Sequence, residues 1–495
     1  MASVSALRQL ANIISASVDR IDAAYKDAGL SYPDMSASYD PTTQSEKLAM
    51  TPELVHESKL IVAAAGQISA LAHVPALTMM STVMGFHIPS ALRCAAESNT
   101  TEILRDHPEG LHVKDIAARN GMDPSKVARM LRILATNHIY EEVSRDVFRN
   151  NRLSSLMDTG KTIDELKARP LDKHIGNSGF AALVEHCGDE MFKCSAYLTD
   201  VWLDPELGSR DSTVPPHSLA FNTKKTAFEW YEEPGNKGRL IRFGVAMQGS
   251  KSAESPTAIL KGFKWDSLPA DSVIVDVGGG TGHVSLIIAK ENPMFRYVVQ
   301  DRAAVIPHAK DYWLANLPSA LEAGRVEFQG KILNSYFLVF SPFRASSVAF
   351  DLYAGQTVKN AAVFMMRFIL HDYGYKNSKI MLTRLREAAA PHTKLLIVEQ
   401  VAPYACPTED DLTHGTRIPG AGHVQGPPPP APLLANLGKA NNVVYCTDMQ
   451  MAAILGGEER TLGGFVDLLS DAGWKVTEVF AVHGTLAKQI WAVPV

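Results

Sequence analysis

A histidine and two glutamates in this sequence have side chains suited to moving a proton. Each lies close to the end of a predicted strand or the start of a predicted helix. His371 follows the apolar run Ala361–Leu370, which predicts a strand. Glu399 ends the next predicted strand, and Glu459 comes just before a predicted helix. A histidine at the carboxyl end of a central strand lies over the ligand edge of an open α/β sheet, and imidazole takes up a proton near neutral pH. A carboxylate bonded to one ring nitrogen would stabilise the imidazolium, so we predict a general base with acidic partners; a purely structural histidine is the alternative.

A glycine-rich stretch forms a second candidate site. Val273–Val277 is a short, mostly β-branched run that predicts a buried parallel strand, and it leads into three consecutive glycines and then Gly282. The backbone must turn sharply there and stay open for a ligand. The apolar pattern through Ala289 predicts a helix whose N-terminus points at that ligand. A strand, a glycine turn and a helix make the nucleotide-binding corner of an α/β sheet.

The spacing of these glycines excludes the usual dinucleotide fingerprint. That fingerprint needs glycines at its first, third and sixth positions. The sixth position is His283 when counted from Gly278 and Ser285 when counted from Gly280. A Walker lysine is absent as well. What remains is Asp276-x-Gly-x-Gly-x-Gly, in which the acidic residue suits a cationic group better than a pyrophosphate.

The strand predicted after this corner, Arg296–Gln300, ends at Asp301. An acidic residue in that place can accept hydrogen bonds from ribose hydroxyls. Together with the glycine stretch, this arrangement resembles the class I S-adenosylmethionine-dependent methyltransferases. The resemblance implies S-adenosyl-L-methionine as the cofactor. Its contacts would include Asp276, Gly278, Gly280 and Asp301.

Composition and charge limit the class of protein. With 46% hydrophobic and 20% charged residues, the 495-residue chain has the composition of an ordinary globular protein, long enough for two or three domains. The formal net charge of −5 argues against nucleic acid as a partner, because phosphate binding leaves a basic footprint. The five cysteines have no paired metal-ligand spacing, and the sequence shows neither a signal-peptide pattern nor a bilayer-length apolar run. We therefore expect a cytoplasmic enzyme with reduced thiols and no membrane association.

The block 90–151 predicts helices, a turn and a two-stranded wing, a shape that also occurs in DNA-binding proteins. Its third helix carries Lys126, Arg129 and Arg132, which could touch phosphates. The same helix has a wide apolar face, however, and its flanks are acidic. The acidic residues are Asp115, Glu141, Glu142 and Asp146. This charge balance favours packing against another subunit over DNA binding, and a role in the core alone is the remaining interpretation.

Aromatic and thioether side chains gather in two stretches that precede the first strand of the predicted sheet. These are Phe228–Tyr231 and Phe243–Gln248. Such side chains could line an apolar substrate pocket. Ordinary core packing is an equally good interpretation of each residue taken singly.

The motifs taken together are similar to the caffeate/flavonoid-type small-molecule O-methyltransferases, particularly their fungal branch. They are Asp276-Val-Gly-Gly-Gly-Thr-Gly, Arg367-Phe-Ile-Leu-His-Asp372, Val398-Glu399 and Glu459-Arg-Thr461, and the resemblance covers roughly residues 60–495. It implies a phenolic or enolic hydroxyl as acceptor, no metal, and a homodimer formed through the winged-helix block.

The same resemblance assigns roles to single residues. His371 would be the base with Glu399 and Glu459 beside it, and Arg367 stands where the family often has a cofactor-contacting lysine. Tyr373 departs from the family's usual tryptophan but keeps an aromatic ring.

A second departure follows the third predicted strand, Arg325–Gln329. There the family reaches a cofactor-contacting aspartate within a few residues, whereas here the apolar stretch 331–349 intervenes. We match Asp351 to the adenine-contacting aspartate and Leu352 to its apolar neighbour. The stretch is too hydrophobic for an exposed loop. Our hypothesis is an insertion that derives from untranslated sequence, which sequencing the transcript would test.

We therefore predict an α/β protein with a Rossmann-like seven-stranded methyltransferase sheet, preceded by a mostly helical winged-helix dimerisation domain. The predicted divisions are an N-terminal tail (1–55), the winged-helix domain (56–165), a helical connecting and substrate-pocket region (166–265) and the cofactor-binding catalytic domain (266–495). The predicted reaction is methyl transfer to a hydroxyl, with a histidine base. Two alternatives remain: a methyltransferase-like pericyclase or dehydratase that transfers no methyl group, and a winged-helix DNA-binding protein.

Overall fold

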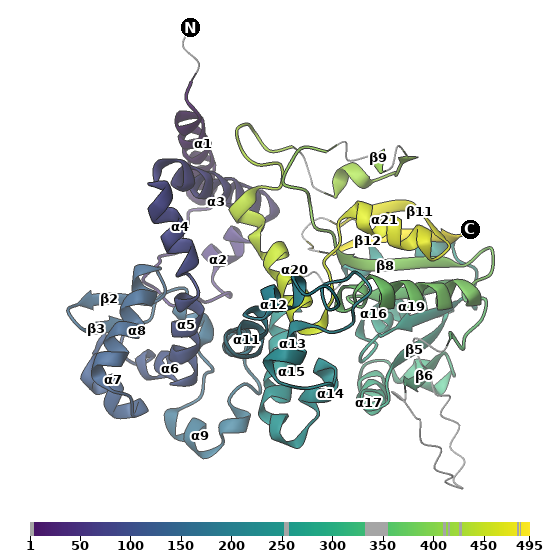
Figure 1. Ribbon diagram of the computed structural model, residues 1–495, viewed down its shortest axis with the longest axis horizontal. Coiled ribbons are helices and arrows are strands. Elements are labelled where there is room, and N and C mark those ends of the chain that lie inside the picture. The colour runs from purple at the N-terminus through teal and green to yellow at the C-terminus, as the bar shows by residue number, and fades with distance from the viewer. Residues whose placement is uncertain are drawn as a thin grey trace. The chain divides into compact units, whose positions relative to one another are not determined.

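The computed structural model describes residues 4–251, 257–331, 355–408, 412–413, 416–424, 428–482, 485 and 487–495. The chain divides into two compact units (Figure 1). The first comprises Met1–Thr199, Pro216–Ala253 and Pro429–Asn441, and the second comprises Asp200–Pro215, Glu254–Pro428 and Asn442–Val495. Apart from Lys331, the predicted insertion and the matched residues Asp351 and Leu352 lie outside the described residues.

The first unit is mostly helical and begins with two long helices, α1 (Ala6–Asp27) and α3 (Pro52–Ala72). A salt bridge of 2.7 Å between Arg20 and Glu57 joins them, and buried apolar side chains such as Ile21 pack between them. The other helices of this unit before the winged block are α2 (Gln44–Ala49) and α4 (Pro75–Val83). The helices after it are α9 (Ile163–Ala168), α10 (Phe180–His186), a π-helical turn (Cys187–Met191), α11 (Phe192–Ser195), α12 (Leu198–Trp202, which crosses into the second unit), α13 (Pro216–Ala220), α14 (Ala227–Tyr231) and α15 (Lys237–Lys251).

The winged block has its own buried core, formed by side chains such as Ile116 and Leu131. Its elements are α5 (His87–Glu97), α6 (Thr100–Leu104), β1 (Leu111–His112), α7 (Val113–Asn120), α8 (Pro124–Thr136), β2 (Glu141–Ser144) and β3 (Val147–Arg149). The helical stretch before the wing is divided into α5 and α6, because Asn99 between them adopts a left-handed backbone (φ 54°). The wing also has three strands rather than two, since β1 pairs with β3.

In the described part of the chain, no single helix is both long and apolar enough to cross a bilayer. Only α3 and α4–α5, which are bent by 119° relative to each other, have that length and composition as a pair.

The second unit is built on a seven-stranded sheet in the order β11-β12-β8-β7-β4-β5-β6. Its strands are β4 (Val273–Val277), β5 (Arg296–Arg302), β6 (Val326–Lys331), β7 (Val363–Arg367), β8 (Lys394–Gln400), β11 (Trp474–Ala481) and β12 (Ala487–Pro494). The five strands from β8 to β6 are parallel, and β12 is antiparallel to both of its neighbours. The fold-class prediction is confirmed.

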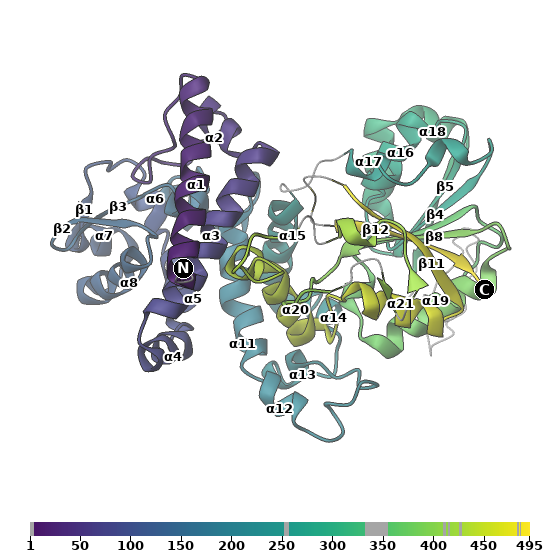
Figure 2. The ribbon, with the colours of Figure 1, turned by 90° about the horizontal axis from the view of Figure 1, so that it is seen from above.

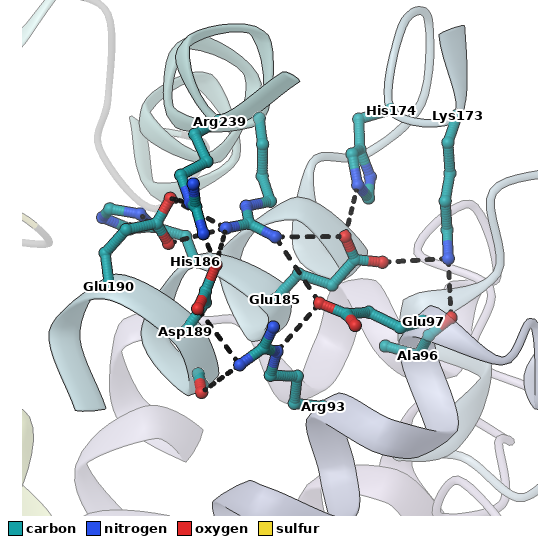
Figure 3. A network of polar contacts seen from close by, with 12 residues as sticks. Arg93, Ala96, Glu97, Lys173, His174, Glu185, His186, Asp189, Glu190 and Arg239 are labelled. Carbon is teal, nitrogen blue, oxygen red and sulfur yellow. Dashed lines mark hydrogen bonds and ion pairs between the residues drawn. The ribbon is translucent and has the colours of Figure 1, made fainter. Parts of the chain in front are cut away.

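Helices cover both faces of this sheet (Figure 2). On one face lie α19 (Tyr375–Ala388) and α21 (Leu462–Asp471), whose apolar side chains pack on the strands. On the other lie α16 (His283–Glu291) and α17 (Ile306–Asn316), anchored by residues such as Trp313. The unit also contains α18 (Pro318–Glu322), α20 (Asn442–Leu455) and the short pair β9 (Leu412–Thr413) and β10 (Thr416–Arg417). Because both faces are covered, the central strands β4, β7 and β8 are mostly apolar.

The central strand β7 ends earlier than its apolar sequence predicts. The run Ala361–Leu370 is strand only as far as Arg367, because Phe368 adopts a left-handed backbone (φ 51°). A 3₁₀ turn, Leu370–Asp372, follows. The chain therefore leaves the sheet before His371, which lies on a turn at the carboxyl edge of the sheet and not on the strand itself.

Candidate active site

The loop after β4 turns through glycines whose backbone is left-handed. The φ angles are 75° at Gly278, 61° at Gly280 and 69° at Gly282, values that disfavour any residue with a Cβ. A Cβ on Gly278 would lie 2.3 Å from the Ile369 side chain, and one on Gly282 would lie 2.5 Å from the Trp313 ring. Apart from its neighbours in the chain, none of the described residues lies within 4 Å of a Cβ placed on Gly280. The loop is therefore packed at its two ends and open at its centre.

Two carboxylates border this loop. Asp276 is buried at the end of β4, and its Oδ2 accepts a hydrogen bond from Ser285 Oγ (2.6 Å). Burial raises the pKa of Asp276 to about 6 against the effect of that bond, and the charge of Asp301 adds to the rise. Asp301, on β5, accepts a hydrogen bond from the Gly280 N–H (2.7 Å) through Oδ2. A cation bound beside the loop would relieve the repulsion between these two acids.

Arg367, the last residue of β7, belongs to the same edge of the sheet. Its guanidinium lies over the Phe368 ring, 4.6 Å from the centroid, and its positive charge opposes the rise in the pKa of Asp276. The structure thus brings Asp276, Asp301 and Arg367 together from three neighbouring parallel strands.

The turn that carries His371 lies next to the glycine loop, since Ile369 contacts Gly278. The imidazole Nδ1 is 2.8 Å from Glu459 Oε1, and Nε2 is 3.4 Å from Asp372 Oδ1. An ionised carboxylate can only accept a hydrogen bond, so Nδ1 carries the proton on the Glu459 side. The His371 side chain is 16% exposed, so the ring is not sealed off from solvent.

Glu399 supports the turn rather than the ring. It is fully buried near the end of β8, and its Oε1 accepts hydrogen bonds from the backbone N–H groups of Ile369 (2.9 Å) and Leu370 (2.8 Å). The remaining oxygen, Oε2, accepts no hydrogen bond from the described residues, and the same holds for Oε2 of Glu459. Two acidic side chains therefore approach His371 in different ways, one through the ring and one through the backbone.

The charges of this cluster shift its titration strongly. Burial alone would lower the pKa of His371, but the carboxylates of Glu399, Asp372 and Glu459 outweigh it and raise that pKa to about 10. Burial raises the pKa of Glu399 to about 7 and that of Asp372 to about 6, although the nearby imidazolium opposes both shifts. The free protein therefore holds an imidazolium among partly protonated acids at neutral pH.

The spacing of the cluster would also suit a cation. One ligand atom each from His371, Glu399 and Glu459 lies within 4.8 Å of the others. Two of the oxygens already accept hydrogen bonds, from the imidazole and from the backbone of the turn. This agrees with a hydrogen-bonded base, and the absence of a metal stays a prediction.

Sequence reasoning did not single out three residues that shape this site. Ser285 holds Asp276, Asp372 approaches the Nε2 side of the base, and Arg460 bonds the backbone of its turn. The sequence offered one signal for Arg460, its place directly after Glu459 in the Glu-Arg-Thr motif.

Comparison with known proteins supplies the family. Residues 80–159 match the O-methyltransferase dimerisation domain. An O-methyltransferase of Armillaria gallica is 36% identical over 99% of this chain and 100% of its own length. The 4-O-methyltransferase 1 of Phanerochaete chrysosporium is likewise 36% identical, over 99% of both chains.

Solved structures show the same fold at low identity. The mitomycin 7-O-methyltransferase MmcR has a TM-score of 0.58 at 16% identity, covering 87% of this chain and 99% of its own. LepI in complex with S-adenosylmethionine has a TM-score of 0.59 at 16% identity, covering 92% and 100%. A structure described as a pericyclic reaction enzyme has a TM-score of 0.60 at 16% identity, covering 89% and 94%.

Proposed function

Since the chain belongs to the S-adenosylmethionine-dependent O-methyltransferases, we propose that it methylates a hydroxyl of a phenolic or enolic small molecule with His371 as the general base. The observation that carries this proposal is the 2.8 Å contact between His371 Nδ1 and Glu459, on a turn that packs against the glycine loop through Ile369. The base and the cofactor loop are thereby parts of one local structure.

The cofactor supplies an electrophilic methyl group on a positively charged sulfur. The residues that fit it are the open Gly280, the buried acid Asp276 beneath the loop, and Asp301, whose carboxylate oxygens retain lone pairs for hydroxyl groups. Acidic side chains beside a glycine loop favour a positively charged ligand that lies directly against the main chain of the loop. We propose that Gly278 and Arg367 complete this set.

His371 would act through Nε2. Glu459 fixes the tautomer by holding Nδ1–H, so that Nε2 of the neutral ring can accept a proton from the acceptor hydroxyl. A phenol with a pKa near ~10 is mostly neutral at pH 7, so the base must take the proton while the new C–O bond forms. The three carboxylates around the ring stabilise the imidazolium that results.

Replacement of the base tests this proposal. We expect His371→Gln to lower turnover with a methyl-labelled cofactor by ~10²–10⁴ while cofactor binding persists. The matched control is His308→Gln, at an exposed position on α17, which should retain activity. Unchanged turnover of His371→Gln on a phenol that the enzyme methylates would reject His371 as the base.

A second candidate follows from two of the solved structures, a pericyclic reaction enzyme and LepI bound to S-adenosylmethionine. In this alternative the bound cofactor contributes only charge and no methyl group moves. The His371–Glu459 pair supports the methyltransferase. Product analysis with labelled cofactor separates the two, because the alternative leaves the product unlabelled.

DNA binding has less support. Arg132 on α8 bonds both Glu142 and Asp146 of the wing at 2.7 Å, so its charge is already neutralised within the block. We propose instead that the winged block serves association of two chains, in keeping with its match to a dimerisation domain.

An exposed apolar face suggests where a second copy would bind. It runs from the end of α3 along α4 and includes Leu71, Val74, Leu77, Met79, Met80 and Val83, each at least half exposed. It continues into the matched dimerisation domain, which begins at residue 80. We expect Met80→Glu with Val83→Glu to shift a dimer to monomer in light scattering, and Met294→Glu, at an exposed site of the second unit, to leave the mass unchanged. A dimer that survives the paired change would place the interface elsewhere.

A further inference from the structure

Arg460 is a buried cation directly beside the proposed base, and it has no part in the proposed proton transfer. It is 1% exposed. Its two terminal nitrogens donate hydrogen bonds to the carbonyl oxygens of Leu370 (2.8 Å) and Tyr373 (2.7 Å). These two carbonyls lie on either side of the dipeptide His371-Asp372. One planar guanidinium thus bridges the whole turn that carries the base.

The segment around Arg460 is attached to the same turn at further points. The Glu458 N–H donates to the His371 carbonyl oxygen (2.9 Å). A Cβ on Gly457 would lie 1.9 Å from that oxygen, so only glycine fits there. Residues 457–460 therefore hold the main chain of the base turn, while Glu459 from the same segment holds the ring.

A buried guanidinium is costly unless it is well paired. Burial lowers the pKa of Arg460, while the negative charges of Glu458, Glu399 and Glu459 stabilise its cationic form. Removing such a group alone leaves its buried partners unpaired and destabilises the fold, so any test of its role must separate stability from the rate of the chemical step. Arg460 bonds these two carbonyl oxygens through two different nitrogens of one rigid plane, whereas a lysine has a single nitrogen and cannot place one at each oxygen. This rigid two-point attachment points to a geometric role.

We propose that Arg460 is a positioning residue for His371: by bridging the Leu370 and Tyr373 carbonyls, it fixes the imidazole between Glu459 and the acceptor hydroxyl. This inference rests on the proposed role of His371. A residue that places the base acts on the chemical step and leaves cofactor binding nearly untouched, and misplacement by 1 Å can cost about 10²-fold in rate.

The test uses the full-length enzyme with a phenol that it methylates. Arg460→Lys keeps the charge but loses the bridge, so we expect kcat to fall ~10–100-fold with the KM for the cofactor within about twofold of its original value. The pH midpoint of its rate profile should stay in place. Arg460→Met loses the charge as well, so its midpoint should also move to higher pH, by about one unit.

Arg386→Met is the matched control in the same unit. Arg386 also bonds backbone carbonyls, those of Gly473 and Val495, but it does not touch the base turn. We expect this variant to lower the melting temperature while kcat and the pH midpoint stay unchanged. A purely structural role of Arg460 would give its variants the same pattern, and that outcome would overturn the inference.

A double variant separates the inference from the function on which it rests. If Arg460 acts through His371, Arg460→Lys should cause no further loss of kcat in the His371→Gln background, because the two changes remove the same contribution. An equal loss in both backgrounds would refute the positioning role alone. If His371→Gln by itself leaves turnover unchanged, the proposed base is wrong. Cofactor binding by calorimetry verifies that each variant is folded.

Discussion

Removing the charge of Glu399 should move the pH dependence of the reaction. His371 is a base only when neutral, and its pKa is raised to about 10, with Glu399 the first of the carboxylates that raise it. The rate should therefore rise with pH through the alkaline range. Glu399→Gln keeps an Oε1 that can accept the Ile369 and Leu370 N–H groups but has no negative charge, so the rising limb should move to lower pH.

The structure sets the size of this shift. Ligand atoms of His371 and Glu399 lie within 4.8 Å of each other. At an effective dielectric constant of about 20, two unit charges at that separation interact by ~3.5 kcal/mol, or about 2.5 pH units. Because burial raises the pKa of Glu399 to about 7, its carboxyl is charged across the alkaline limb, and the full effect should appear there. We expect a displacement of about 1–2.5 units.

The assay is the initial rate of methyl transfer from pH 6 to 10.5 at constant ionic strength and saturating cofactor. Glu387→Gln, an exposed residue paired with Arg384 on α19, is the control and should leave the midpoint in place. The raised pKa of His371 also stabilises the folded protein below the unfolded value of ~6.5, and this stability is lost as the pH rises through about 10. Thermal melting across the same range should show that loss, reduced in Glu399→Gln. An unmoved limb, or one displaced to higher pH, would refute the electrostatic reasoning.

Three further predictions concern the cofactor edge. Gly278→Ala should lower both the melting temperature and turnover, because its Cβ would lie 2.3 Å from Ile369 and the backbone there is left-handed. Wild-type activity of this variant would contradict the close packing of the glycine loop against the turn that carries His371. Asp276→Asn should weaken cofactor binding about tenfold or more in calorimetry, since it removes a negative charge beside a cation; an unchanged affinity would exclude that role. Extensive dialysis against a chelator should leave methyl transfer intact, and restoration of lost activity by a divalent ion would assign the His371 cluster to a metal instead.

The sheet and the glycine corner could be predicted from the sequence because short-range pattern determines both. Val273–Val277 is β-branched and apolar, and the glycines that follow need left-handed angles that other residues avoid. The end of β7 could not be predicted in the same way. Phe368 lies within an unbroken apolar run, and its left-handed angle follows from the tertiary hydrogen bonds of the turn after it, which Glu399 accepts.

The exact contacts of the residues around His371 could not be predicted from the sequence either. That Glu399 and Glu459 belong with His371 came from motif resemblance, but which of them bonds the ring required coordinates. Glu399 bonds the backbone, whereas Glu459, 88 positions from His371 in the sequence, bonds the imidazole. Arg460 could not be assigned from sequence, because an arginine next to an acid usually lies on a solvated surface. The structure shows instead that it is buried and donates hydrogen bonds to the turn.

The attachment of the base turn has a consequence for where substitutions can disturb it. The contacts to His371 and its turn described above, from Glu459, Glu399, Arg460 and Gly457, all come from the second unit. Substitutions confined to the first unit therefore leave these contacts in place.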